Sequence, residues 1–130
     1  AFSIAMVLAS NPAHKVLMLP GQYDGREDLI HGAEAIDALQ RFRASKAFLG
    51  ASGITAEGPN DAGVGPGLIY GAMMRRASET IILADHSKFE RPSLSVYGEW
   101  SASVTLVSDQ APEGTLAASL RQAQVKVLCG

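Results

Sequence analysis

Short apolar runs alternate along this chain with segments of helical periodicity, and this alternation restricts the possible folds more than any other feature. Strands are expected at residues 15–19, 28–31, 46–49, 80–84, 105–107 and 125–128, and helices at 2–9, 33–43, 68–77 and 112–122. Such alternation is typical of a layered α/β domain, Rossmann-like, with a mostly parallel sheet. The strands are apolar on both faces, which predicts helices over both faces of the sheet.

Composition and charge exclude several classes of function. The 130 residues fit one domain, with 47% apolar and 18% charged residues. A net charge of −2 and only 11 Lys and Arg residues leave no basic stripe, so the chain alone is not expected to hold DNA. No apolar run is long enough to span a bilayer, and one cysteine, Cys129, excludes an intrachain disulfide. A cytoplasmic location is expected.

Polar and glycine-rich segments follow the ends of the expected strands, where ligands gather in parallel α/β sheets. Gly21 follows the strand at 15–19. A glycine there lets backbone amides approach a ligand closely, and the alternative is a simple turn that ends the strand. The run from Gly50 to Gly53 follows the strand at 46–49, and a glycine-rich loop at 57–67 comes next. Amides of these segments suit an anion, although a flexible surface loop explains them equally well.

The segment after the strand at 80–84 carries the side chains best suited to a ligand. Lys88 offers a positive charge for a phosphate, Ser87 a hydrogen-bond donor, and Asp85 an acceptor for a sugar hydroxyl. The alternative is a solvated loop with an ion pair. The three histidines show no metal-binding spacing, and His86 is expected to face solvent.

Two of these runs together resemble the DeoR family of bacterial transcriptional regulators. They are Lys-Ala-Phe-Leu-Gly-Ala-Ser-Gly-Ile at 46–54 and Ile-Ile-Leu-Ala-Asp-His-Ser-Lys-Phe at 81–89, which is similar to the family's "LADSSKF". Weaker similarities at 2–5, 17–23, 72–77 and 106–109 follow in the family's order. The resemblance therefore covers nearly the whole chain.

The resemblance implies a sensor domain over residues 1–130, sharing its fold with ribose-5-phosphate isomerase and CoA transferases. Such a domain binds a phosphorylated sugar or related metabolite and controls operator DNA through an attached N-terminal winged helix. That winged helix is expected to lie outside this chain, as are the first strands of the sensor and their "DxGTT" phosphate loop. Homo-oligomers are expected, with another chain covering the sheet edge. Asp61 corresponds only approximately to an aspartate of the family.

The comparison with the isomerases separates an enzyme from a sensor. Those enzymes resemble this chain but carry "GADE" where it has Gly-Ala-Ser-Gly at 50–53, so the carboxylates for proton transfer are missing. Lys88 corresponds to a substrate-binding lysine, so binding survives without catalysis. Two alternatives are an isomerase-like enzyme, with Asp61 or Glu57 as base, and an oligomerisation module without a ligand. The effector site is expected at Gly21, Gly50, Ala51, Ser52, Gly53, Asp61, Asp85, Ser87 and Lys88, with no metal, cofactor or catalytic residue.

Overall fold

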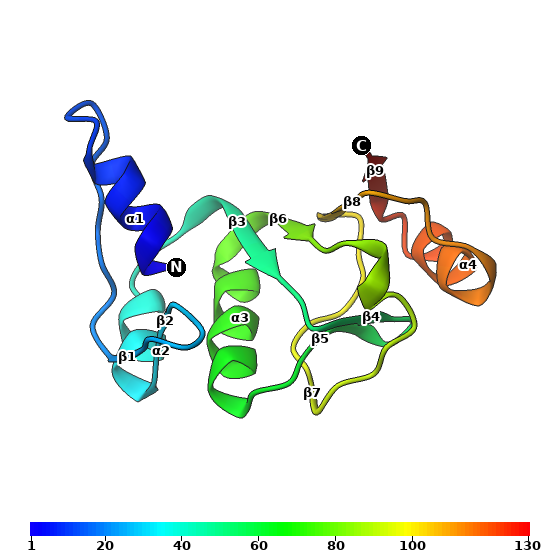
Figure 1. Cartoon of the computed structure of the whole chain (residues 1–130), viewed down its shortest axis with the longest axis horizontal. Coiled ribbons are helices and arrows are strands. Elements are labelled where there is room, and N and C mark those ends of the chain that lie inside the picture. The colour runs from blue at the N-terminus through cyan, green and yellow to red at the C-terminus, as the bar shows by residue number, and fades with distance from the viewer.

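A parallel four-stranded sheet forms the centre of the computed structural model, which describes residues 1–130 (Figure 1). Its strands lie in the order β3 (Ala44–Gly50), β6 (Ala77–Leu83), β8 (Val104–Ser108) and β9 (Lys126–Cys129). All three neighbouring pairs are parallel. The predicted α/β class with a mostly parallel sheet is therefore confirmed.

One face of this sheet carries the main core. The register pairs Leu49 with Ile82 and Ile82 with Leu106, so these three side chains form one buried row. Helix α3 (Val64–Arg76) packs against β3 and β6, and helix α4 (Gly114–Gln122) adds the buried Leu116 and Leu120. Fully burying a leucine or isoleucine side chain contributes about 1.5–3 kcal/mol, so this row anchors the domain.

The opposite face of the sheet is largely open, and the prediction of helices over both faces is wrong for this chain. Phe48 is 63% exposed, Leu83 50% and Leu128 44%. The reason is topological, because the strands follow one another across the sheet in a single direction. Right-handed crossovers in one direction place every connecting helix on the same face.

A small antiparallel sheet takes two strands from the connection between β3 and β6 and a third from the connection between β6 and β8. It consists of β4 (Gly53–Thr55), β5 (Gly58–Asp61) and the short β7 (Ser95–Val96). The loop predicted at 57–67 is therefore partly strand and partly the start of α3. Asn60, usually a turn residue, is buried here and donates its side-chain amide to the Gly58 carbonyl at 2.8 Å. Pro66 is compatible with the first turn of a helix, where no N–H is required.

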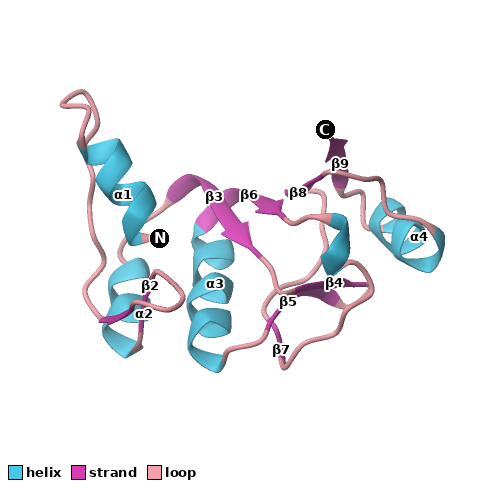
Figure 2. Cartoon of the chain, viewed as in Figure 1, coloured by secondary structure: helices cyan, strands magenta, loops and turns pink.

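The N-terminal third forms its own small cluster beside α3. It contains α1 (Phe2–Ala9), a hairpin of β1 (Gln22–Asp24) and β2 (Leu29–His31), and α2 (Ala33–Leu39) (Figure 2). The strand predicted at 15–19 is absent, because no neighbouring strand supplies hydrogen bonds there and Leu17 is 82% exposed. The helix predicted at 33–43 ends four residues earlier, at Leu39.

The remaining elements agree with the predictions apart from their ends. A single-turn helix, η1 (His86–Lys88), follows β6 and occupies part of the polar loop expected there. None of the helices combines the length and the apolar character that crossing a membrane requires.

Candidate functional site

The carboxyl ends of β3, β6 and β8 surround a polar hollow of about 430 Å³. This is the edge at which parallel α/β sheets bind ligands. Of the residues singled out from the sequence, the structure brings four to this hollow: Gly50, Ala51, Asp85 and Lys88. Five further residues complete the lining: Leu83, Ala84, Val107, Ser108 and Asp109.

The turn of η1 sets the position of Lys88 at this edge. Asp85 precedes the turn and its carboxylate accepts a hydrogen bond from the Ser87 amide at 2.9 Å, as capping aspartates do. Hydrogen bonding from the Ser87 side chain and amide holds the pKa of Asp85 below its ordinary value. Lys88 is half-buried, and its ammonium has no carboxylate within ion-pair distance. The hollow therefore contains an unpaired cation.

Asp109, which directly follows β8, is a second carboxylate at the hollow and is bound to His86. Its carboxylate accepts the His86 amide at 2.7 Å and contacts the His86 Nδ1 atom at 2.6 Å. Both side chains are half exposed. Hydrogen bonding from the His86 side chain, then from its amide, lowers the pKa of Asp109 to about 2.

Neither partner of this pair was assigned a site role from the sequence. His86 was expected to face solvent, and it is exposed, but it also ties two strand-end loops together. His86 lines a separate hollow with Phe89 and Glu113, not the one that contains Lys88. A usable signal existed, because polar residues after neighbouring parallel strands meet at one edge.

Tyr97 contacts the end of β3 and was also not predicted from the sequence. Its hydroxyl donates a hydrogen bond of 2.6 Å to the Gly50 carbonyl at the end of β3. The side chain is buried, which raises the pKa of the Tyr97 hydroxyl. Its ring packs edge-on against Tyr70 of α3, with the centroids 5.3 Å apart. Tyr97 therefore fixes the strand end on which the hollow is built.

The second half of the glycine-rich motif lies outside the hollow. Gly53 is buried against the backbone of Arg91, and a Cβ atom there would lie 1.8 Å from the Arg91 carbonyl oxygen. The Ser52 hydroxyl accepts the Ala62 amide at 3.3 Å. The Asp61 carboxylate accepts the Gly63 amide at 2.8 Å and closes the turn before α3. These three residues organise the small sheet and its turns.

Gly21 does not line the hollow either and directly precedes β1 of the β1–β2 hairpin. Its φ of +143° is a conformation that residues with side chains rarely adopt. A Cβ atom there would lie 2.6 Å from the His31 carbonyl oxygen. The alternative interpretation from the sequence, a turn, fits these contacts, although the turn precedes β1 and ends no strand, because none forms at 15–19.

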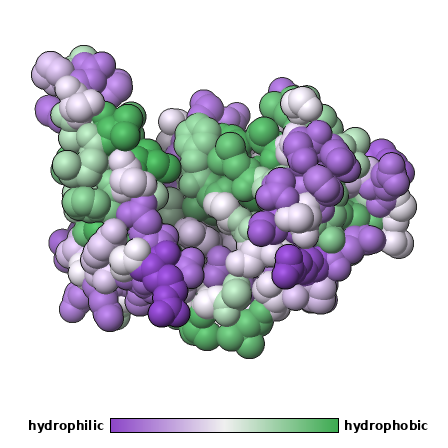
Figure 3. Space-filling model, viewed as in Figure 1, coloured by the Kyte–Doolittle hydropathy of each residue, from purple (hydrophilic) through white to green (hydrophobic).

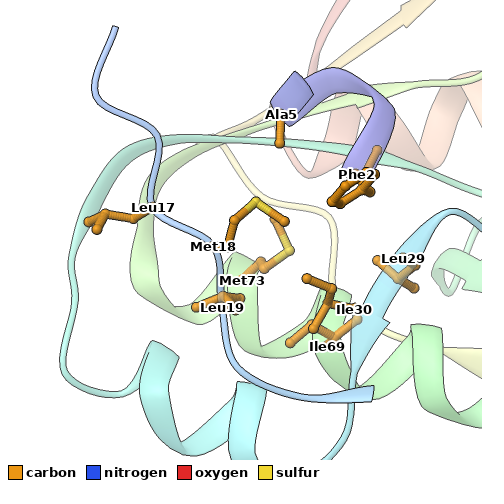
Figure 4. A pocket seen from close by; sticks show the side chains of 10 residues that line it. Phe2, Ala5, Leu17, Met18, Leu19, Leu29, Ile30, Ile69 and Met73 are labelled. Carbon is orange, nitrogen blue, oxygen red and sulfur yellow. The ribbon is translucent and has the colours of Figure 1, made fainter. Parts of the chain in front are cut away.

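A second hollow of about 170 Å³ lies beneath α1, and its lining is entirely apolar (Figure 4). Side chains of α1, of the segment 17–19, of β2 and of α3 surround it. Without a polar side chain it offers nothing to orient a sugar or a phosphate. The outer side of α1 is also apolar, with Val7 72% exposed (Figure 3).

The polar hollow combines groups of both charges with a hydroxyl. Asp85, Asp109 and Lys88 supply two carboxylates and one ammonium, and the buried Ser108 supplies a hydroxyl. No group of three or more His, Cys, Asp or Glu side chains is arranged to hold a metal ion. The arrangement suits a ligand that has both an anionic group and hydroxyl groups.

The sequence of this chain is similar to several known proteins. The sequence model described as the DeoR C terminal sensor domain matches residues 1–110. The HTH-type transcriptional repressor GlcR of Bacillus subtilis (strain 168) is 28% identical over 112 residues, which is 86% of this chain and 43% of that protein. The glycerol-3-phosphate regulon repressor of Haemophilus influenzae is 30% identical over 96% of this chain and 49% of its own length.

A third relative, the HTH-type transcriptional repressor CsqR of Escherichia coli (strain K12), is 23% identical. Its match covers 96% of this chain and 48% of its own length. The chain thus spans about half the length of the curated relatives it matches.

Proposed function

This chain belongs to the DeoR C-terminal sensor domain family, and we propose that it binds a phosphorylated sugar or a related phosphorylated metabolite at the hollow around Lys88. Ligand binding then changes how a winged helix, in another part of a longer regulator, holds operator DNA. The regulator acts in the cytoplasm as a homo-oligomer. A ligand acts in this way only by preferring one arrangement of the protein over another.

The observation that carries this proposal is the unpaired ammonium of Lys88 at the carboxyl edge of the sheet. A half-buried lysine without a carboxylate partner is a favourable place for a phosphate oxygen. The backbone of Gly50 and Ala51 lies across the same hollow and leaves room for a ligand. One relative is named for a glycerol-3-phosphate regulon, which supports a phosphorylated small molecule.

The charge balance of the hollow indicates how such a ligand would be oriented. Two carboxylates face one ammonium, so a phosphate near the centre would be repelled more than attracted. The phosphate is therefore best placed against Lys88 and the Gly50–Ala51 backbone, with sugar hydroxyls toward Asp85. Further cations or amides from the rest of a longer protein would strengthen this binding.

We propose binding without catalysis. A general base works best when its pKa lies near the working pH. Asp85 and Asp109 are both held as carboxylates, with lowered pKa values, by donors from Ser87 and His86. Asp61 and Glu57, the bases of the enzyme alternative, do not line the hollow. The family relatives are repressors, which supports a sensor.

A thermal-shift screen with phosphorylated sugars tests this function. A ligand at a hundred times its dissociation constant adds about 2.7 kcal/mol to the free energy of unfolding. Lys88→Ala removes a charged hydrogen-bond donor and should weaken binding about tenfold or more. Lys15→Ala is the matched control, because Lys15 is an exposed loop lysine with the same charge and does not line the hollow.

Each outcome of this screen has a distinct meaning. A shift lost in Lys88→Ala and kept in Lys15→Ala supports the site. A ligand that binds the Lys88→Ala variant as tightly as the wild type contradicts it. No shift with any phosphorylated sugar, in this chain or in a longer one with the winged helix, would favour the oligomerisation module. The open sheet face around Phe48 and Leu83 is what favours that alternative.

A further inference from the structure

The contact between His86 and Asp109 joins the two loops that frame the polar hollow. His86 opens η1 after β6, and Asp109 directly follows β8, the neighbouring strand. Each carboxylate oxygen of Asp109 has its own donor group on His86, the amide at 2.7 Å and Nδ1 at 2.6 Å. Ser108 adds a third contact, from its hydroxyl to Asp109 Oδ1 at 3.2 Å. The carboxylate is therefore held in one orientation.

This orientation matters because Asp109 and Lys88 line the same hollow. A carboxylate and an ammonium that line the same hollow attract each other, and their pairing would occupy the cation that a ligand needs. No such pair is present, although Lys88 lies only two residues beyond His86. The other carboxylate of the hollow, Asp85, likewise accepts a hydrogen bond, from the Ser87 amide at 2.9 Å.

We propose that His86 is a positioning residue of the effector site: it holds the Asp109 carboxylate so that the Lys88 ammonium stays free for the anionic group of the ligand. His86 is not among the residues that line the hollow proposed for the ligand, and it lines a different one. The role of the free ammonium rests on the proposed function. The arrangement of the three side chains does not, and it is measurable without any ligand.

The segment that contains Lys88 is also held at its other end, at Phe89 and Glu90. The Glu90 amide donates to the Ile54 carbonyl at 2.7 Å, and Phe89 forms an isolated parallel β-bridge with Ile54. The segment from 85 to 90 is thus fastened at both ends, by Asp109 at one and by Ile54 at the other. Loss of the His86 side chain would leave the backbone fastened at Ile54 and would free only the Oδ2 atom of Asp109, because Oδ1 keeps the His86 amide and the Ser108 hydroxyl.

A set of four variants tests the proposal without a ligand. The rate at which an acylating reagent labels Lys88, read by mass spectrometry, reports whether its ammonium is paired. In His86→Ala the Oδ2 atom of Asp109 loses its donor, and it should pair with Lys88 and slow labelling about threefold, the size expected for a partly exposed ion pair. His86→Asn keeps an amide donor near the position of Nδ1 and should label like the wild type. The double variant His86→Ala with Asp109→Asn removes the competing charge and should restore the rate, and Asp109→Asn alone should not slow it.

The same variants are then titrated with inorganic phosphate and with glucose 6-phosphate, followed by the amide NMR signals of Gly50 and Lys88. The affinity for these anions should follow the labelling rate. His86→Ala should bind them about threefold more weakly than the wild type, and the double variant should bind them as tightly as the wild type. Equal Lys88 labelling in His86→Ala and the wild type would overturn the inference, as would a double variant that stays slow. If labelling behaves as expected but no phosphorylated sugar binds the wild type, in this chain or in a longer one with the winged helix, the proposed function fails and only the arrangement of His86, Asp109 and Lys88 stands.

Discussion

Gly50 and Gly53 lie three residues apart in one glycine-rich run, yet alanine should affect them in opposite ways. At Gly53 a Cβ atom would lie 1.8 Å from the Arg91 carbonyl oxygen and 3.0 Å from its carbon, so the backbone itself is in the way. At Gly50 an added Cβ atom meets nothing within 4 Å. The pair therefore forms a matched test of the structure.

The cost of Gly53→Ala follows from what has to move. The Arg91 carbonyl must retreat by roughly 1 Å or more, and overpacking of this kind costs about 1–3 kcal/mol. The neighbouring Glu90 amide, which donates to Ile54 at 2.7 Å, would lose or stretch its hydrogen bond, a further loss of about 1 kcal/mol. The free energy of unfolding should fall by about 2–4 kcal/mol in total.

Urea unfolding followed by circular dichroism measures this difference. Gly53→Ala should clearly lower the urea midpoint. In a thermal scan, a loss of about 3 kcal/mol corresponds to a fall of roughly 10 °C in Tm for a domain of this size. Gly50→Ala should be as stable as the wild type or slightly more stable, because alanine restricts the unfolded chain. Equal stability of the Gly53→Ala variant and the wild type would refute the close approach of Arg91 to β4.

Two further predictions concern the residues that support the hollow. Tyr97→Phe removes the 2.6 Å hydrogen bond to the Gly50 carbonyl and should lower the free energy of unfolding by about 1 kcal/mol. Urea denaturation measures this loss. An unchanged midpoint would mean that water replaces the hydroxyl without cost. Because the pKa of Asp109 is lowered from 3.8 to about 2, its stabilising contribution is present above pH 3.8 and is lost as the pH falls through about 2. Asp109→Asn should therefore lose less stability than the wild type over that pH window in urea titrations, and identical acid profiles would contradict the His86 contact.

The alternation of apolar strands and amphipathic helices was enough to predict the α/β class and most elements. It failed at 15–19, where the apolar pattern of a strand is present but no partner strand supplies hydrogen bonds. It also failed at 57–67, where glycine, proline and asparagine form strand β5, because buried hydrogen bonds of Asn60 override their usual preference for turns. Local patterns do not contain the pairing partners of a sheet.

The sequence by itself determined which side chains stand at the carboxyl ends of the strands. Asp85 and Lys88 follow β6 directly, and Gly50 ends β3, so their meeting follows from the parallel sheet alone. Only the tertiary structure decided that Gly53, three residues beyond Gly50, packs against Arg91, and that His86 reaches Asp109, 23 residues away in sequence. Those contacts depend on how separate loops pack together in space, whereas the strand ends depend only on the order of elements along the chain.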